Sequence, residues 1–422
     1  MPKKSLFNLT TLDNGLRIVS ERMPSVRTAS LGFWIESGSR MERPGQEGMA
    51  HFLEHLAFKG TTSRTTHDIA LDLDILGGLS NAFTSREATC FHIRVADKHF
   101  AQAFEITADL VLNPSPSDEE TAREKEVVLQ EISMVEDAPE DKIHEDCWES
   151  IWNDPAVAHP ILGRPETVAS FSRDDLDAFR ALHYAPSNIL ISAAGDVDHD
   201  ALAEMTEKAF ARVPASPRPP KPGAAAYVPA NIAISRDVEQ NHVIVSFPAL
   251  SNVHPERFTQ TVLSTLLGGN MSSRLFQEVR EKRGLAYSIY AHVNSLSDLA
   301  VMQIQAAVDP GRTVELLETI AAELDRLAKD GPSDKECAHT REHLQGLLYL
   351  GSESTESRMM RLARNQLLFG RDIPYEETAK SIQAVKPEAV HEMAARLLDP
   401  SHRSLALLGP DINPEWNKIL IP

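Results

Sequence analysis

The sequence contains few cysteines, and they lie far apart. Cys90, Cys147 and Cys337 are odd in number and form no CxxC pair. Neither a disulfide framework nor a thiolate zinc site is therefore expected. This use of cysteine indicates a reducing compartment, so the cytoplasm is the expected location.

Long apolar runs are also missing. No segment approaches the roughly 20 apolar residues that a membrane-spanning helix needs. The N-terminal stretch MPKKSLFNLTTLDNGLRIVS has no apolar core of a secretory signal and no long Arg/Ser-rich presequence. The sequence also has no Gly-x-Gly phosphate loop and no convincing Ser-His-Asp or Cys-His signature.

Positive charge is scarce relative to negative charge. The 42 lysines and arginines face 61 acidic residues, which gives a net charge of -19. Such a surface repels nucleic acid and anionic lipid, so neither is an expected partner. Hydrophobic residues make up 42% and charged residues 24% of the chain, which is typical of a globular protein. The length of 422 residues predicts two or three domains.

A proline-rich segment divides the chain into halves of similar length. Residues 213–224 read VPASPRPPKPGA and contain five prolines, a composition that favours an extended spacer. We therefore expect an N-terminal domain at 1–212, a linker at 213–224 and a C-terminal domain at 225–422.

Strand-like and helical patterns alternate along the first half. The β-rich runs and the helical patterns are both short, as expected for an α+β fold in which helices pack on a sheet. The expected strands are Leu16–Ser20, Ala29–Ser37, Thr89–Val95 and Ile189–Ala194, and the expected helices are Gln46–Phe58, Thr66–Leu76, Asp97–Leu112, Ser117–Val135 and Arg173–His183.

The second half resembles a degenerate copy of the first. The sequence Pro-Ser-Asp begins a helix at residue 116 and again at residue 332, an offset of 216 residues. An offset of 210 residues places HFLEHLA (51–57) on TVLSTLL (261–267). The two histidines and the glutamate of the first segment are there replaced by Thr, Thr and Ser. The simplest interpretation is a duplicated fold with one active copy, and the alternative is a chance match of helix starts.

The segment GMAHFLEHLAFKG contains His51, Glu54 and His55. On a helix these positions share one face, so two imidazoles and a carboxylate project together. Histidines at i and i+4 can bind one zinc ion, which lowers the pKa of a bound water to about 7. This is the inverted HxxEH order, in which Glu54 would act as the general base. Two unrelated surface histidines are the alternative.

Two imidazoles need a third ligand, and the helix expected at Ser117–Val135 supplies several acids. Glu124 and Glu131 are seven residues apart and therefore lie on one helix face. One could bind the metal while the other supports it, and the residue pattern does not choose between them. The acidic candidates on or next to this helix are Glu119, Glu120, Glu124, Glu126, Glu131 and Glu136.

Several stretches, in the same order over most of the chain, resemble the M16 (pitrilysin-like) metallopeptidases, specifically the two-domain branch with mitochondrial processing peptidase and its bacterial relatives. They are GMAHFLEHLAFKGT (48–61), LGGLSNAFTSREAT (76–89), EKEVVLQEISMVED (124–137), HYAPSNILISAAGDVD (183–198) and MSSRLFQEVREKRGLAYSIYA (271–291). The resemblance implies two homologous α/β sandwich domains that form a clam shell, with the active site in the first copy.

The resemblance also assigns roles to residues. In that family the third ligand lies about 75 residues after HxxEH, and 75 residues lie between His55 and Glu131 here. His51, His55 and Glu131 are thus the implied Zn²⁺ ligands, and Glu124 takes the supporting acidic position. Arg280 and Tyr287 match a C-terminal pair that reaches the scissile carbonyl. Asn81 and Ala82 match an edge strand that pairs with an extended substrate.

The implied function is that of a zinc metalloendopeptidase acting on unfolded or presequence-like peptides through a zinc-bound water activated by Glu54. An acidic run follows Glu131, and some of its carboxylates, Asp141 and Glu145 among them, are candidates for reading a basic residue of the substrate; a solvated helix face is the alternative. A homodimer, or a monomer that closes on itself, is expected because one chain carries both halves of the site. One rival interpretation is a non-catalytic M16-like subunit that binds peptides or supports a hetero-oligomeric peptidase, and a second is a zinc hydrolase that acts on something other than peptides.

Overall fold

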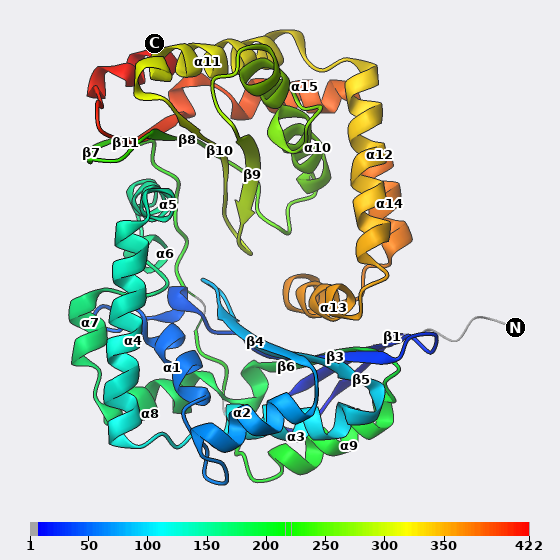
Figure 1. Ribbon diagram of the computed structural model, residues 1–422. Helices are drawn as coiled ribbons and strands as arrows, with labels where there is room; N and C mark the ends of the chain where they lie inside the picture. Colours follow the sequence, from blue (N-terminus) through cyan, green and yellow to red (C-terminus); the bar gives the residue numbers. More distant parts are fainter. Residues whose placement is uncertain (1–6, 216, 221, 422) are drawn as a thin grey trace, which may run out of the picture. The chain divides into compact units, whose positions relative to one another are not determined.

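A computed structural model describes residues 7–215, 217–220 and 222–421 (Figure 1). Parts of the N-terminal stretch and of the proline-rich linker therefore lie outside the described residues. The chain forms two compact units, each built from three segments. The first unit comprises Met1–Ser133, His159–Gly223 and Leu350–Ile373, and the second comprises Met134–Ala158, Ala224–Tyr349 and Pro374–Pro422.

The first unit contains a six-stranded mixed sheet. Its order is β1-β2-β6-β3-β5-β4, in which only β2 and β6 run parallel and β4 lies at one edge. The strands are β1 (Phe7–Thr11), β2 (Arg17–Arg22), β3 (Thr28–Ile35), β4 (Leu79–Thr84), β5 (Thr89–Ala96) and β6 (Ile189–Gly195). The four strands expected from sequence are confirmed, and β1 had no clear signal because most of its residues are exposed and its half-buried residues do not alternate regularly.

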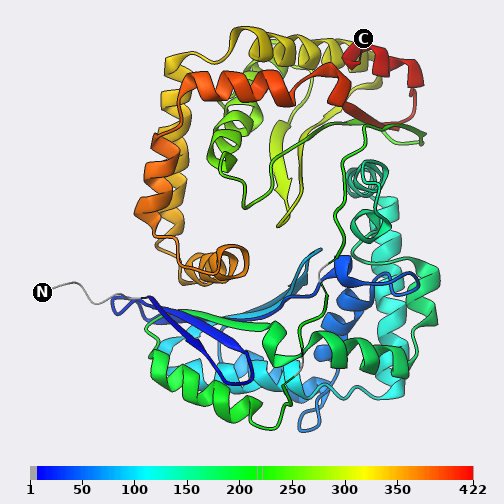
Figure 2. The ribbon, with the colours of Figure 1, turned by 180° about the vertical axis from the view of Figure 1, so that it is seen from behind.

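Helices cover both faces of this sheet (Figures 1 and 2). Along β3, Leu31 and Phe33 join one buried cluster, which includes residues of α2 (Thr66–Ile75), α3 (Phe100–Leu112) and α9 (His199–Phe210). Trp34 points to the opposite face and packs against Met359 and Leu362 of α13 (Thr355–Phe369). Because both faces are buried, β3 reads as a nearly continuous apolar run.

The second unit contains a five-stranded sheet of order β7-β11-β8-β10-β9. Helices α10 (Arg257–Gly268), α11 (Thr313–Asp330) and α15 (Pro387–Leu397) bury one face, and α5 (Pro139–Ser150) covers the other with Ile143 and Cys147. The strands are β7 (Asn231–Ser235), β8 (Asn241–Pro248), β9 (Ile289–Ser295), β10 (Ala300–Val308) and β11 (Ser404–Gly409).

The predicted duplication is borne out by the helix boundaries. Helix α4 (Asp118–Asp137) and helix α12 (Asp334–Gly351) begin 216 residues apart, and so do α5 at Pro139 and α13 at Thr355. Helix α10 spans the residues that an offset of 210 pairs with HFLEHLA. The expected α+β fold of two sheet-plus-helix domains is therefore confirmed.

The compact units differ from the contiguous halves 1–212 and 225–422. Helix α5 comes from the N-terminal half but packs on β8 and β11, and α13 comes from the C-terminal half but packs on β2, β3 and β6. Each half thus lends one helix to the sheet of the other, because each sheet has a second apolar face to bury. Hydrophobic patterning identifies such helices but does not say which sheet they cover.

The remaining elements complete the two units. The other helices are α1 (Met49–Ala57), α6 (Pro155–Ala158), α7 (Pro165–Ser170), α8 (Arg173–His183), α14 (Tyr375–Gln383), α16 (Asn417–Leu420) and the π-helical turn Phe276–Lys282. Cys90, Cys147 and Cys337 are buried free thiols, as expected. Within the described residues, none of the helices is long and apolar enough to cross a bilayer.

Candidate metal centre

Helix α1 presents His51, Glu54 and His55 together, as the HxxEH spacing predicts. The two imidazole rings lie 4.5 Å apart, centroid to centroid. The other side of the helix carries Phe52 and Leu56, which are buried in an apolar cluster. This apolar packing fixes the rotation of α1, so the metal-binding face is directed away from the core.

Helix α4 brings Glu131 to the two histidines. Val128 and Ile132 of α4 pack into the same apolar cluster as the back of α1. Glu131 Oε2 lies 3.5 Å from His55 Nε2 and 3.8 Å from His51 Nε2. One donor atom from each of the three residues lies within 4.8 Å of the other two. The structure therefore brings together the three residues that the family resemblance implied as ligands.

These donor atoms fit a small divalent cation. Donors about 2.0–2.1 Å from a tetrahedral zinc ion stand roughly 3.4 Å from one another, close to the spacing found here. Burial, together with the charge of His55, lowers the pKa of His51 to about 3, so its imidazole is neutral at pH 7. Two imidazoles and one carboxylate are a donor set that zinc accepts in catalytic sites.

Glu124 orients His55 instead of joining the ligand set. Its Oε1 lies 2.8 Å from His55 Nδ1, which leaves Nε2 of that ring facing Glu131. Its Oε2 lies 2.8 Å from Lys59 Nζ. Burial acts to raise the pKa of Glu124, but the hydrogen bonds from His55 and Lys59 lower it below its ordinary value. The geometry thus separates two acids that local sequence reasoning left equivalent.

Lys59 was not anticipated from sequence. It lies just beyond α1, and its only signal was its place in the resembling stretch GMAHFLEHLAFKGT. By pairing with Glu124 it compensates the charge of a carboxylate that is almost fully buried.

We expect Glu124→Gln to lower zinc affinity by about 10- to 100-fold, because an amide is a poorer acceptor for the His55 N–H and leaves Lys59 unpaired. Zinc affinity would be measured by competition with a chromophoric chelator. Glu126→Gln, an exposed change on the same helix, is the control. Equal affinities of the two variants would contradict the orienting role.

Thr84 is a second residue that sequence reasoning missed. It ends the edge strand β4, and its hydroxyl donates a 2.6 Å hydrogen bond to Glu54 Oε2. The pKa of Glu54 is raised above its ordinary value, mainly by burial and also by the charge of Glu131. The hydrogen bond from Thr84 and the charge of His55 oppose this shift. A buried carboxylate with a raised pKa and a fixed rotamer is suited to accept a proton.

The edge strand β4 borders the same site. Asn81 is exposed and Ala82 half-buried, and both lie on this strand, whose other edge pairs with β5. The strand and the metal helix line one open hollow, formed by Glu54, His55, Phe58, Lys59, Ser80, Asn81, Ala82 and Glu124. Free backbone groups of an edge strand therefore stand beside the predicted general base.

Four further predicted residues belong to the second unit. Asp141 and Glu145 lie on α5, where Asp141 is exposed and Glu145 half-buried. The guanidinium of Arg280 stacks on the Tyr287 ring at 4.7 Å, and Tyr287 is 83% exposed. The structure thus brings Arg280 and Tyr287 together as a pair, and their predicted roles in catalysis remain proposals.

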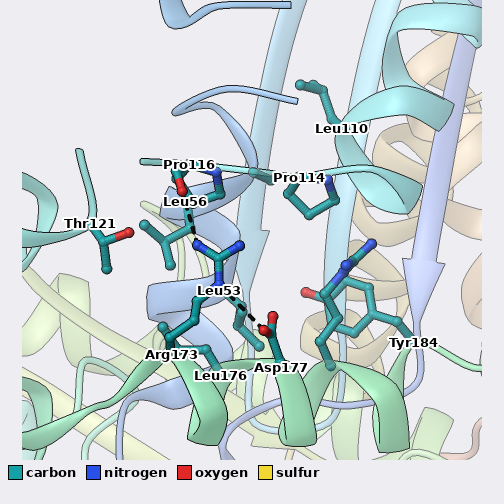
Figure 3. Close-up of a pocket in the computed structure, with 12 residues that line it drawn as sticks. Leu53, Leu56, Leu110, Pro114, Pro116, Thr121, Arg173, Leu176, Asp177 and Tyr184 are labelled. Atoms are coloured by element: carbon teal, nitrogen blue, oxygen red, sulfur yellow. Dashed lines mark hydrogen bonds and ion pairs between the residues drawn. The ribbon is translucent and has the colours of Figure 1, made fainter. Parts of the chain in front are cut away.

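A narrow cavity lies behind α1, on the side away from the metal face (Figure 3). Leu53 and Leu56 of α1 line it, and Arg173 crosses it, donating to the carbonyl oxygen of Pro116 at 2.9 Å and pairing with Asp177 at 3.3 Å. Its free volume of about 30 Å³ has room for about two water molecules. The back of the metal helix is therefore closely packed.

Two family models match the chain in succession. The description "Insulinase (Peptidase family M16)" matches residues 17–164, and "Peptidase M16 inactive domain" matches residues 170–344. The chain is 38% identical over 407 residues to an uncharacterized zinc protease of Mycobacterium leprae, covering 95% of this chain and 91% of that protein. It is 37% identical over 403 residues to the uncharacterized zinc protease YmxG of Bacillus subtilis, covering 96% and 98%.

Solved structures show the same fold. A protease from Helicobacter pylori superposes with a TM-score of 0.90 at 22% identity, covering 96% of this chain and all of the other. A structure from Pseudomonas fluorescens described as a peptidase M16 inactive domain gives a TM-score of 0.87 at 19% identity, covering 96% and 98%. With relatives of this identity and coverage, the chain belongs to peptidase family M16.

Proposed function

We propose that this protein is a zinc metalloendopeptidase that hydrolyses unfolded or presequence-like peptides. The observation that carries the proposal is the cluster of His51, His55 and Glu131 with Glu54 beside it on the same helix face. Relatives over nearly the full chain bear the name zinc protease, which supports zinc as the metal.

The residues of this chain divide the chemistry between them. His51, His55 and Glu131 would hold the zinc ion, which supplies Lewis-acid activation of the attacking water and the scissile carbonyl. Glu54 would take a proton from the attacking water, whose oxygen bonds to the carbonyl carbon, and would return the proton to the leaving amine as the C–N bond breaks, which regenerates the enzyme. Thr84 holds the Glu54 carboxylate in one orientation during both transfers.

Substrate selection follows from the edge strand. An extended peptide can add to the free edge of β4 through backbone hydrogen bonds, with Asn81 and Ala82 along its length. This mode of binding requires an unfolded segment, because a folded protein does not offer a free strand. Arg280 and Tyr287 are proposed to bind the scissile carbonyl and its developing negative charge.

The non-catalytic alternative is less well supported by the distribution of the site residues. The match to the inactive domain covers 170–344, whereas all the proposed metal ligands and Glu54 lie within the 17–164 match. The inactive-domain match therefore includes neither the proposed metal ligands nor Glu54, although it begins in the first unit and runs into the second copy of the fold. In that copy the residues paired with His51, Glu54 and His55 are Thr261, Ser264 and Thr265.

The proposed location and oligomeric state follow from the cysteines and from the distribution of the active residues. We propose a cytoplasmic homodimer, since one chain carries the complete predicted set of active residues and its three thiols are free. Asp141 and Glu145 are proposed to attract a basic residue near the cleavage point, as suits carboxylates on an acidic helix.

The test is mass spectrometry of a presequence-like peptide incubated with the purified protein. We expect discrete cleavage that chelation abolishes, and slower cleavage of a matched peptide in which the arginines near the cut are alanines. Equal cleavage of both peptides would remove the proposed roles of Asp141 and Glu145. No cleavage of either peptide by fully zinc-loaded protein would favour the non-catalytic alternative.

A further inference from the structure

The start of the metal helix is held by a buried carboxylate from outside the helix. Helix α1 begins after Gly48, whose φ of 94° would be strained for any residue with a side chain. Because glycine is the N-cap residue, no side chain at that position caps the helix. Instead, Glu42 Oε2 accepts the N–H of Gly48 at 2.9 Å and Glu42 Oε1 accepts the N–H of Ala50 at 2.8 Å. The next residue is the proposed ligand His51.

His159 holds this carboxylate in turn. Its Nε2 lies 2.9 Å from Glu42 Oε2, and the two side chains are 6% and 0% exposed. Burial raises the pKa of Glu42, while the hydrogen bonds from His159, Ala50 and Gly48 act against that shift. A carboxylate at the N-terminal end of a helix also interacts favourably with the helix dipole.

The residues after His159 brace the same turn. Thr167 Oγ1 donates to the carbonyl oxygen of Glu47 at 2.7 Å. A Cβ at Gly48 would stand 2.5 Å from the Leu162 carbonyl oxygen, and one at Gly163 would stand 2.2 Å from that of Glu47. The backbone before α1 and the segment 159–167 are therefore in direct contact.

We propose that Glu42 and His159 are positioning residues, which fix the first turn of α1 and thereby the place of the His51 imidazole relative to His55 and Glu131. The inference rests on the proposed metal site. Glu42 acts on the backbone at the start of the helix, and His159 acts on it through Glu42. Because metal binding and catalysis depend on sub-ångström placement, loosening this turn affects the site before it affects the fold.

His159 is also the residue at which the chain enters the first unit. The chain passes from the second unit to the first between Ala158 and His159. Just before that point, α6 is tied to α5 by a 2.8 Å hydrogen bond from Trp148 Nε1 to the carbonyl oxygen of Val157. Where the chain enters the first unit, the bond from His159 therefore holds Glu42, the carboxylate that binds the first turn of α1.

The test measures Co²⁺ affinity and the Co²⁺ absorption spectrum in the full-length protein, along with kcat and KM. We expect Glu42→Gln, which keeps the size of the side chain but loses one acceptor oxygen, to weaken Co²⁺ binding about 10-fold, alter the spectrum and lower kcat about 10-fold at unchanged KM. His159→Leu should act in the same direction. His159→Gln, which retains an N–H donor, should recover most of the loss.

Two controls on α9 separate positioning from general stability. Asp198→Ala removes the cap of that helix, where the carboxylate accepts the N–H of Ala201 at 3.0 Å, and Leu202→Ala opens a cavity in the same unit. Both should leave the Co²⁺ spectrum unchanged. Wild-type Co²⁺ affinity in Glu42→Gln, or equal losses in the α9 variants, would overturn the proposal. Since metal binding is measured without substrate, this outcome is independent of whether the protein cleaves peptides.

Discussion

Replacing Glu54 with Gln is expected to reduce peptide hydrolysis by about 10³-fold while the protein still binds one zinc ion. The amide keeps the shape of the side chain and can still accept the hydrogen bond from Thr84. It cannot take a proton from water at neutral pH, so the loss falls on the proton transfer. Activity and zinc content would be measured on the same preparation.

The matched control for this variant is Glu126→Gln, an exposed substitution on α4 that leaves the site intact. It should retain full activity. If Glu54→Gln retained near-normal turnover, Glu54 would not be the general base, and another group in the hollow beside β4 would have to fill that role.

Replacing His51 with Ala is expected to remove both zinc and activity. The substitution leaves His55 and Glu131 as a two-ligand site, which is too weak for stable binding. Loss of the metal removes several kcal/mol of transition-state stabilisation, or about 10³-fold or more in rate. Metal content after dialysis and peptide turnover are the two measurements.

His67→Ala removes an exposed histidine from the neighbouring helix α2 and should change neither quantity. The contrast with Glu54→Gln is the informative result, because one variant is expected to lose chemistry alone and the other to lose the metal as well. A zinc-loaded His51→Ala protein would contradict the predicted ligand set.

Local sequence patterns predicted five helices of the first half, α1 to α4 and α8, but not α5 to α7 or α9. Helix α8 has the predicted bounds, and α1 lies within the range expected from its apolar positions. The ends of α1 were less clear, because its cap comes from Glu42 outside the helix and not from a Ser, Thr or Asp at its start. Strand β4 was placed only through the family resemblance, since its exposed edge has no regular alternation of apolar residues.

The polar contacts of the site were the least predictable part. Lys59 and Thr84 bond to site residues, Glu42 bonds to the start of the metal helix, and His159 bonds to Glu42. Lys59 lies 65 residues from Glu124, and Thr84 lies 30 residues from Glu54. Glu42 lies 8 residues from Ala50, and His159 lies 117 residues from Glu42. Spacing along one helix cannot indicate contacts between separate elements, so these residues looked like ordinary polar side chains.

The sequence by itself determined the chemistry on offer and the duplicated α+β fold. Two histidines and an acid at helical spacing share a face wherever that helix packs, because the geometry of the helix requires it. Tertiary structure alone decided that Glu131 meets the histidines while Glu124 turns to His55 and Lys59, since that depends on how α4 packs against α1. It also decided that α5 and α13 each cover the sheet of the other half, because the burial of a second sheet face is a property of the whole fold.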